Sequence, residues 1–140
     1  MKSLIAVFLV SLLLLGGCDM CKNKNNNTTT DRISIVNDIS FCHDFYVEQN
    51  KVYYRCEVTI ENSHNSEKVI KLTGFRPRDV DVGLILNQEL YLTDESGNPC
   101  DISLPPNSTK RYEVYFVGDH AGGFTKADRL MPIIEITEIG

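Results

Sequence analysis

Apolar and polar residues alternate with a period of two through much of the chain. In residues 52–61 every second side chain is apolar, and the side chains between them are polar, charged or tyrosine. Successive side chains of a strand point to opposite faces of a sheet, so this alternation predicts a strand with one buried face. Residues 39–47 repeat the pattern, and the intervening Gln49-Asn50 predicts a tight antiparallel hairpin.

A two-residue loop determines which residues of this hairpin face each other. The pairing begins at Val47 with Val52 and matches large apolar residues along the whole ribbon. In this register Cys42 lies on the face opposite to that of Cys56, and a one-residue slip would turn the apolar row outward. We therefore expect no disulfide between them, and expect Cys56 to be a small buried hydrophobe. The predicted apolar row of the first strand is Ile39, Phe41, His43, Phe45 and Val47.

More short strands are predicted after the hairpin, separated by polar turns. The turn at residues 94–98 fits a hairpin, and Val80 to Leu86 fits a short helical turn. The further predicted strands are 68–75, 88–93, 99–104, 110–117 and 133–139. Seven or eight short strands without a long helix predict an all-β, antiparallel β-sandwich, with a small barrel as the alternative.

The first seventeen residues have a different character. Residues 4–15 form an apolar run that only Ser11 interrupts, and Lys2 precedes it. A membrane-spanning helix needs about 20 apolar residues, so this shorter run predicts a secretory signal peptide instead.

The end of that run carries a more specific motif. Leu15-Gly16-Gly17-Cys18 resembles the lipobox of bacterial lipoproteins, in which two small residues precede a lipidated cysteine. The resemblance implies cleavage before Cys18 and attachment of lipid, such as palmitate, to the mature N-terminus. Several acyl chains suffice for stable anchoring. The resemblance also implies a location on the extracytoplasmic side of a bacterial cell membrane. Which membrane stays open, although Asp19 resembles a retention signal of some double-membrane bacteria, and a plain secretory peptide is the alternative.

Composition agrees with a three-part chain. We expect a signal peptide at 1–17, a polar flexible tether at 18–31 and a β-sandwich domain at 32–140. The 140 residues carry a net charge of −5, and removing 1–17 takes away one lysine, which leaves −6. One small acidic domain excludes a multidomain enzyme and is a poor binder of nucleic acid.

Two segments resemble a known domain type. Glu57 to Ile70 is similar to the middle of an immunoglobulin-like domain, and the proline turn and strand from Leu104 to Phe116 are similar to its later part. The whole resembles the small immunoglobulin-like domains of bacterial lipoproteins. The chain has no tryptophan, so the core typical of antibody domains is absent.

Few residues suggest chemistry. Asp119 and His120 lie in a glycine-rich loop that can hold a ligand or a metal, yet no second histidine stands at ligand spacing. His43 falls on the apolar row, where a core histidine is expected. Tyr53 and Tyr115 lie on faces opposite the predicted core and are candidates for contact with another protein.

These patterns predict a non-enzymatic binding or structural module. We expect no cofactor and no nucleic acid; the expected partners are the membrane, through the N-terminal lipid, and another envelope protein. One alternative is an inhibitor of an envelope hydrolase. Another is a metal-handling domain around Asp119 and His120. Pairing among Cys21, Cys42, Cys56 and Cys100 stays open, with none expected to be obligatory.

Overall fold

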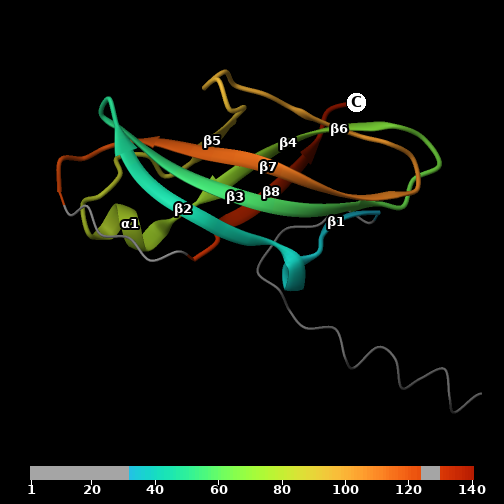
Figure 1. The fold of residues 1–140 in the computed structure, drawn as a ribbon, viewed down its shortest axis with the longest axis horizontal. Coiled ribbons are helices and arrows are strands. Elements are labelled where there is room, and N and C mark those ends of the chain that lie inside the picture. Colours follow the sequence, from blue (N-terminus) through green and yellow to red (C-terminus); the bar gives the residue numbers. More distant parts are fainter. Residues whose placement is uncertain (1–31, 124–129) are drawn as a thin grey trace, which may run out of the picture.

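A computed structural model describes residues 32–123 and 130–140. The predicted signal peptide and tether, with the proposed lipidation site Cys18, lie outside these residues. In the described part, a single antiparallel sheet dominates (Figure 1). Its strands are β1 (Ile33–Ile35), β2 (Phe41–Glu48), β3 (Lys51–Asn62), β4 (Lys68–Phe75), β5 (Leu90–Thr93), β6 (Ile102–Leu104), β7 (Ser108–Asp119) and β8 (Ile133–Glu138). The predicted all-β, antiparallel, sandwich-like fold with seven or eight strands is confirmed.

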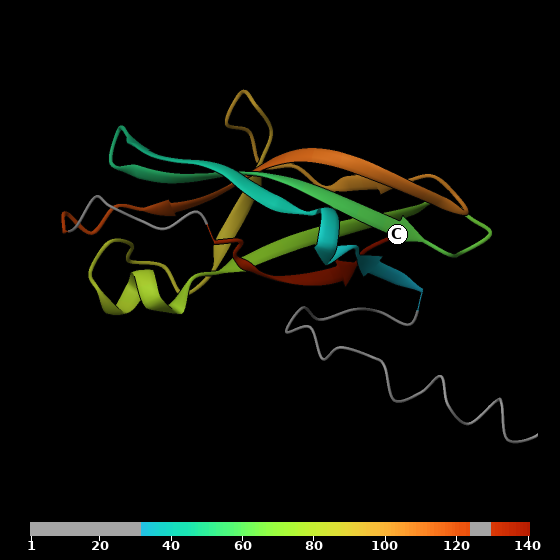
Figure 2. The same ribbon diagram turned by 60° about the horizontal axis from the view of Figure 1, so that its bottom comes forward.

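The sheet curls into a half-barrel with two layers. Hydrogen bonds connect the strands in the order β1-β3-β7-β5-β4-β6, while β2 also pairs with β3 and β8 with β4. Strands β2, β3 and β7 form one layer and β4 and β8 the other, with the short β5 between them (Figures 1 and 2). The apolar faces of both layers point into the space between them, which holds the core.

A row of large side chains crosses the inner face of the first layer. Tyr54 on β3 pairs with Phe45 on β2 and with Phe116 on β7, which in turn pairs with Leu92 on β5. Tyr54 and Phe116 are completely buried. Gly74 on β4 lies against the Phe116 ring, where a Cβ atom would come within 2.7 Å of Cδ1. A glycine is therefore required for the two layers to approach this closely.

The loop of the β2–β3 hairpin is the predicted one. Gln49 and Asn50 both have positive φ, at 50° and 62°, as a two-residue turn that matches the twist of its strands requires. Val47 pairs with Val52 as expected. The pattern of the sequence therefore correctly located the turn and the register next to it.

A β-bulge at His43 shifts the pairing of the residues before it, so the predicted register was wrong there. Asp44 pairs with Arg55 but Cys42 pairs with Cys56, so His43 is the extra residue on β2. The extra residue reverses the alternation, and both cysteines point into the core. The prediction that they face opposite sides was wrong, because it assumed an uninterrupted ladder.

The same bulge turns part of the predicted apolar row outward. Ile39 and Phe41 are exposed, and Ile35 from β1 takes the predicted place of Ile39 opposite Ile60. Ile39 ends a short 3-10 helix, η2 (Asn37–Ile39). His43 was expected in the core, but its Nε2 lies 3.4 Å from Oε1 of Glu57 on the outer face.

The short helix also differs from its prediction. Helix α1 (Pro77–Asp81) begins three residues before Val80, with Pro77 in its first turn, where proline is favoured because no backbone N–H is needed there. The turn at 94–98 forms as expected, with a bridge between Thr93 and Pro99. Strand β6 then pairs with β4 rather than continuing the hairpin with β5.

A buried ionic group attaches helix α1 to the sheet. The Asp79 carboxylate accepts a hydrogen bond from Nε of Arg76 at 2.8 Å and another from the Tyr54 hydroxyl. Arg76 also donates through Nη1 to the backbone carbonyl of Leu130, just before β8. All three side chains of the group are buried. The group therefore joins both layers of the half-barrel at the end where α1 lies.

Candidate functional site

The outer face of β2, β3 and β7 carries a cluster of tyrosines. Tyr46 on β2 pairs directly with Tyr53 on β3, and their rings stack with centroids 4.9 Å apart and planes 11° apart. Tyr115 on β7 pairs with Arg55, two residues farther along β3. The alternation of each strand directs these side chains away from the core, which leaves them half-buried.

These three tyrosines line a groove beside the turn that follows β5. The groove holds about 190 Å³, and residues 93–97 form its other wall. We call it the tyrosine groove. Pockets for small molecules usually measure about 300–1,000 Å³. The tyrosine groove is therefore of a size to receive one or two side chains of another protein.

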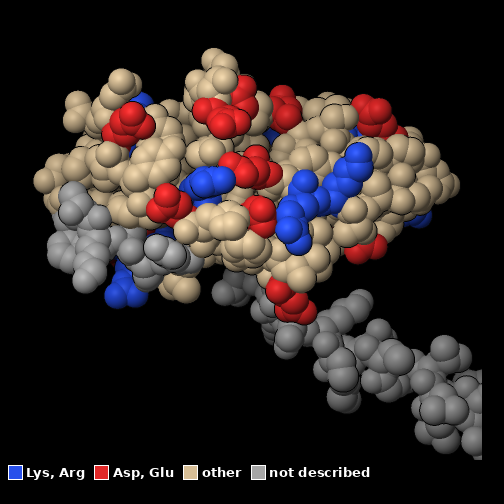
Figure 3. Space-filling model, viewed as in Figure 1, with Lys and Arg blue, Asp and Glu red and all other residues tan. Residues whose placement is uncertain are grey.

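The rim of the tyrosine groove is acidic. Glu48 at the end of β2 and Asp94 and Glu95 in the turn are exposed, and no lysine or arginine is among the described residues that line the groove. Asp94 shapes the turn as well, because its Oδ1 accepts hydrogen bonds from the backbone N–H groups of Ser96 and Asn98. Figure 3 shows acidic side chains along the upper edge of this face.

An ion pair on the same outer face contacts one of the groove tyrosines. Arg55 donates from Nε to Oε1 of Glu113 at 2.9 Å, and the Tyr115 hydroxyl donates to the same oxygen at 3.1 Å. The hydrogen bond from Arg55 lowers the pKa of Glu113, so the carboxylate stays charged at neutral pH. Because Arg55 is paired with Glu113, its positive charge does not neutralise the acidic rim.

Tyr46 and Tyr115 of the groove keep their protons. Burial raises the pKa of Tyr46, and the nearby Tyr53 and Glu48 raise it further. Burial also raises the pKa of Tyr115, followed by its hydrogen bond to the Glu113 carboxylate. Both phenols therefore stay neutral well beyond neutral pH, and each presents an aromatic face and a hydroxyl. Such rings favour cations over their faces and are common anchors of protein interfaces.

Asp119 and His120, the second predicted site, make different contacts at the end of β7. Asp119 forms an ion pair with Lys51 and accepts a hydrogen bond from Nδ2 of Asn87 at 3.3 Å. The hydrogen bond from Lys51 lowers the pKa of Asp119. His120 donates its backbone N–H to the carbonyl of Asn50 and bridges to Ile85. Both residues thus fasten the hairpin loop to the end of β7.

Metal donors are not grouped in the described part of the chain. Within residues 32–123 and 130–140, no set of three or more histidine, cysteine, aspartate or glutamate side chains lies close enough to hold a metal ion. The Nε2 atom of His120 is buried without a hydrogen-bond partner. A single imidazole nitrogen without further donors does not make a metal site.

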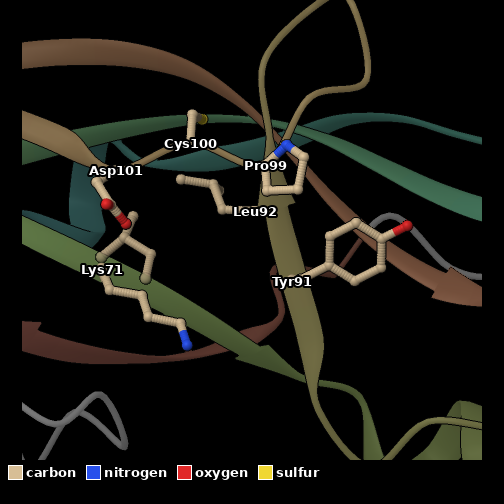
Figure 4. A pocket seen from close by; sticks show the side chains of 7 residues that line it. Lys71, Tyr91, Leu92, Pro99, Cys100 and Asp101 are labelled. Atoms are coloured by element: carbon tan, nitrogen blue, oxygen red, sulfur yellow. The ribbon is translucent and has the colours of Figure 1, made fainter.

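A larger cavity of about 300 Å³ lies where β5 and β6 diverge along β4. Figure 4 shows Lys71 and Cys100 on opposite sides of it, with Leu92 between them. Burial raises the pKa of Cys100, and the carboxylates of Asp94 and Asp101 raise it further. The thiol is therefore a weak nucleophile at neutral pH.

Sequence reasoning found two of the three groove tyrosines and missed Tyr46. The signal was present, because a two-residue loop at 49–50 places Tyr46 opposite Tyr53. The contribution of residues 93–97 was not predictable in this way, since it depends on how β5 packs beside β7.

Of the described helices, none is long and apolar enough to cross a membrane. The comparisons with known proteins add no relative: no family model, no curated protein and no solved structure matches the chain.

Proposed function

We propose that the chain is a lipid-anchored, extracytoplasmic binding module that docks a basic segment of another envelope protein in the tyrosine groove. The lipobox motif at Leu15 to Cys18 supports the anchor. The groove supports the binding role, and it carries the proposal because it joins three aromatic rings to an unneutralised acidic rim.

Charge complementarity indicates the chemistry of the partner. Glu48, Asp94 and Glu95 surround rings whose faces attract cations, so an arginine or lysine side chain gains from both. Arginine fits best because its planar guanidinium stacks on a tyrosine and can still donate to a carboxylate at the rim. Opposite charges across an interface also accelerate association and reject partners of like charge.

The groove lies far from the proposed point of attachment. Strand β1 begins at Ile33, which pairs with Asn62 at one end of β3, while Tyr53 is nine positions away toward the other end. At about 3.3 Å per residue this separation is about 30 Å. A chain tethered through its N-terminus can therefore present the groove to a partner without crowding from the membrane.

Site-directed photocrosslinking in native membranes tests the docking site. A photoreactive amino acid at Ser96, which lines the groove, is expected to give one discrete adduct, whereas the same group at the exposed Glu135 on β8 gives none. A Tyr53→Ala change should reduce the adduct about tenfold or more, since aromatic anchors dominate interfaces. Tyr91→Ala is the matched control, because Tyr91 is exposed outside the groove.

Two further results bear on the proposal. Glu95→Lys should weaken the adduct in the same way, and added salt should weaken it in the unaltered protein, because the rim acts through its charge. Equal adducts from Ser96 and Glu135, or an adduct indifferent to Tyr53→Ala, would rule out the groove as the docking site.

Metabolic labelling with a radioactive fatty acid tests the anchor. The full chain should incorporate label and sediment with membranes, and Cys18→Ala should abolish both. Cys21→Ala is the matched control and should leave the label in place. Label that persists in the Cys18→Ala protein would refute lipidation at this residue, whatever the groove binds.

A further inference from the structure

Two cysteines face each other in the core beside the bulge. Cys42 on β2 and Cys56 on β3 are directly opposite residues of an antiparallel pair. Cys56 is completely buried and Cys42 is 7% exposed. Directly opposite Cβ atoms lie about 4.5–5.5 Å apart, and a disulfide needs about 3.5–4.5 Å, so a small closure of the strands brings the two sulfurs into bonding range.

Both residues are free thiols in the structure. Each sulfur has a weak backbone partner on its own strand, Cys42 with the carbonyl of Asp44 at 3.5 Å and Cys56 with that of Tyr54 at 3.6 Å. The neighbouring Cys56 thiol lowers the pKa of Cys42. The Cys42 thiol, followed by burial, raises the pKa of Cys56. The more exposed sulfur is thus also the better nucleophile.

We propose that Cys42 and Cys56 form a disulfide that covalently joins β2 to β3. The oxidant is a disulfide of the glutathione or thiol-oxidoreductase class. The Cys42 thiolate attacks one sulfur of that disulfide and releases a thiolate, and the Cys56 thiolate then attacks the Cys42 sulfur and releases the second. Two electrons pass from the cysteine pair to the oxidant, and the two thiol protons go to the released thiolates.

The bridge would secure β2 to the strand that holds it in the sheet. Among the described strands, β2 pairs only with β3. It also carries Tyr46, so its position sets one wall of the tyrosine groove. This inference does not rest on the proposed anchor or partner, because the pairing of the two thiols is a property of the fold.

Peptide mapping of the full chain tests the disulfide. Trypsin cleaves after Lys51 and Arg55, which places Cys42 in the peptide 33–51 and Cys56 in the peptide 56–68. After refolding in a buffer of oxidised and reduced glutathione, residual thiols are blocked with iodoacetamide. Mass spectrometry should then detect the two peptides as one linked species that separates on reduction. The peptide 79–110, which contains Cys100, should be alkylated and unlinked.

Variants and one further measurement complete the test. Cys56→Ser should abolish the linked species and leave Cys42 open to alkylation, whereas Cys100→Ser should leave the link intact. Reduction of the unaltered protein should lower the midpoint of urea unfolding, a result that needs no variant. Recovery of both peptides alkylated to the same extent as Cys100, or linkage of either one to Cys21 or Cys100, would overturn the proposal.

Discussion

Replacing Asp79 with alanine is expected to lower the free energy of unfolding by about 3–5 kcal/mol, the usual effect of removing one partner of a buried ion pair. The change leaves the buried Arg76 guanidinium without its carboxylate and the Tyr54 hydroxyl without its acceptor. Arg76 keeps its hydrogen bond to the Leu130 carbonyl. The midpoint of urea unfolding, followed by circular dichroism, measures the effect.

Matched variants separate the buried charge from other causes. Asp81→Ala removes an exposed carboxylate at the end of the same helix and should change stability by less than about 0.5 kcal/mol. Tyr54→Phe removes the hydroxyl alone and should cost about 1–3 kcal/mol, less than Asp79→Ala, because both charges stay paired. An Asp79→Ala protein as stable as Asp81→Ala would show that the group contributes little.

Replacing Phe116 with alanine is expected to cost about 3–5 kcal/mol as well, through lost burial and a cavity between the layers. The ring is completely buried, and it connects the inner row of Tyr54 and Leu92 with Gly74 of the opposite layer. Phe41→Ala is the control, because this ring is largely exposed and its loss should cost far less. Thermal unfolding of the two variants compares them directly.

Gly74 provides an independent check on the same contact. Gly74→Ala places a methyl group against the Phe116 ring and should destabilise the protein by about 1–3 kcal/mol through overpacking. In a Phe116→Leu background the same change should cost less, since leucine lacks the ring atoms that clash. If the effect of Gly74→Ala is the same in both backgrounds, the close approach of the two layers is not what requires a glycine.

Local patterns predicted most strands of this fold. Alternation in residues 52–61 located β3, and Lys68–Phe75 was predicted with the bounds that β4 has. The bulge at His43 escaped prediction because one additional residue leaves the apolar pattern readable in two registers. An uninterrupted ladder would have placed the whole predicted apolar row on the inner face. In the structure Ile35 of β1 lies opposite Ile60, at the position predicted for Ile39.

The proposed docking surface was predictable to a similar extent. Alternation placed Tyr53 and Tyr115 on the outer face, and the hairpin loop implied the position of Tyr46. The Arg76–Asp79–Tyr54 group was not foreseen, since its members come from two elements separated by β4 and meet only after the layers close. The ion pair of Asp119 with Lys51 joins the end of β7 to the start of β3, a contact that the sequence around Asp119 and His120 does not indicate.

The bulge at His43 has a consequence for how the length of this chain can change. Asp44 pairs with Arg55 and Cys42 with Cys56, so His43 is the one residue of this stretch that has no counterpart on β3. Loss of that single residue would join Cys42 to Asp44 and leave each cross-strand neighbour where it is. A deletion elsewhere in β2 would exchange inner and outer side chains on one side of the gap. The hairpin therefore has a position at which a one-residue deletion is neutral for pairing, and related chains that differ in length are expected to differ there.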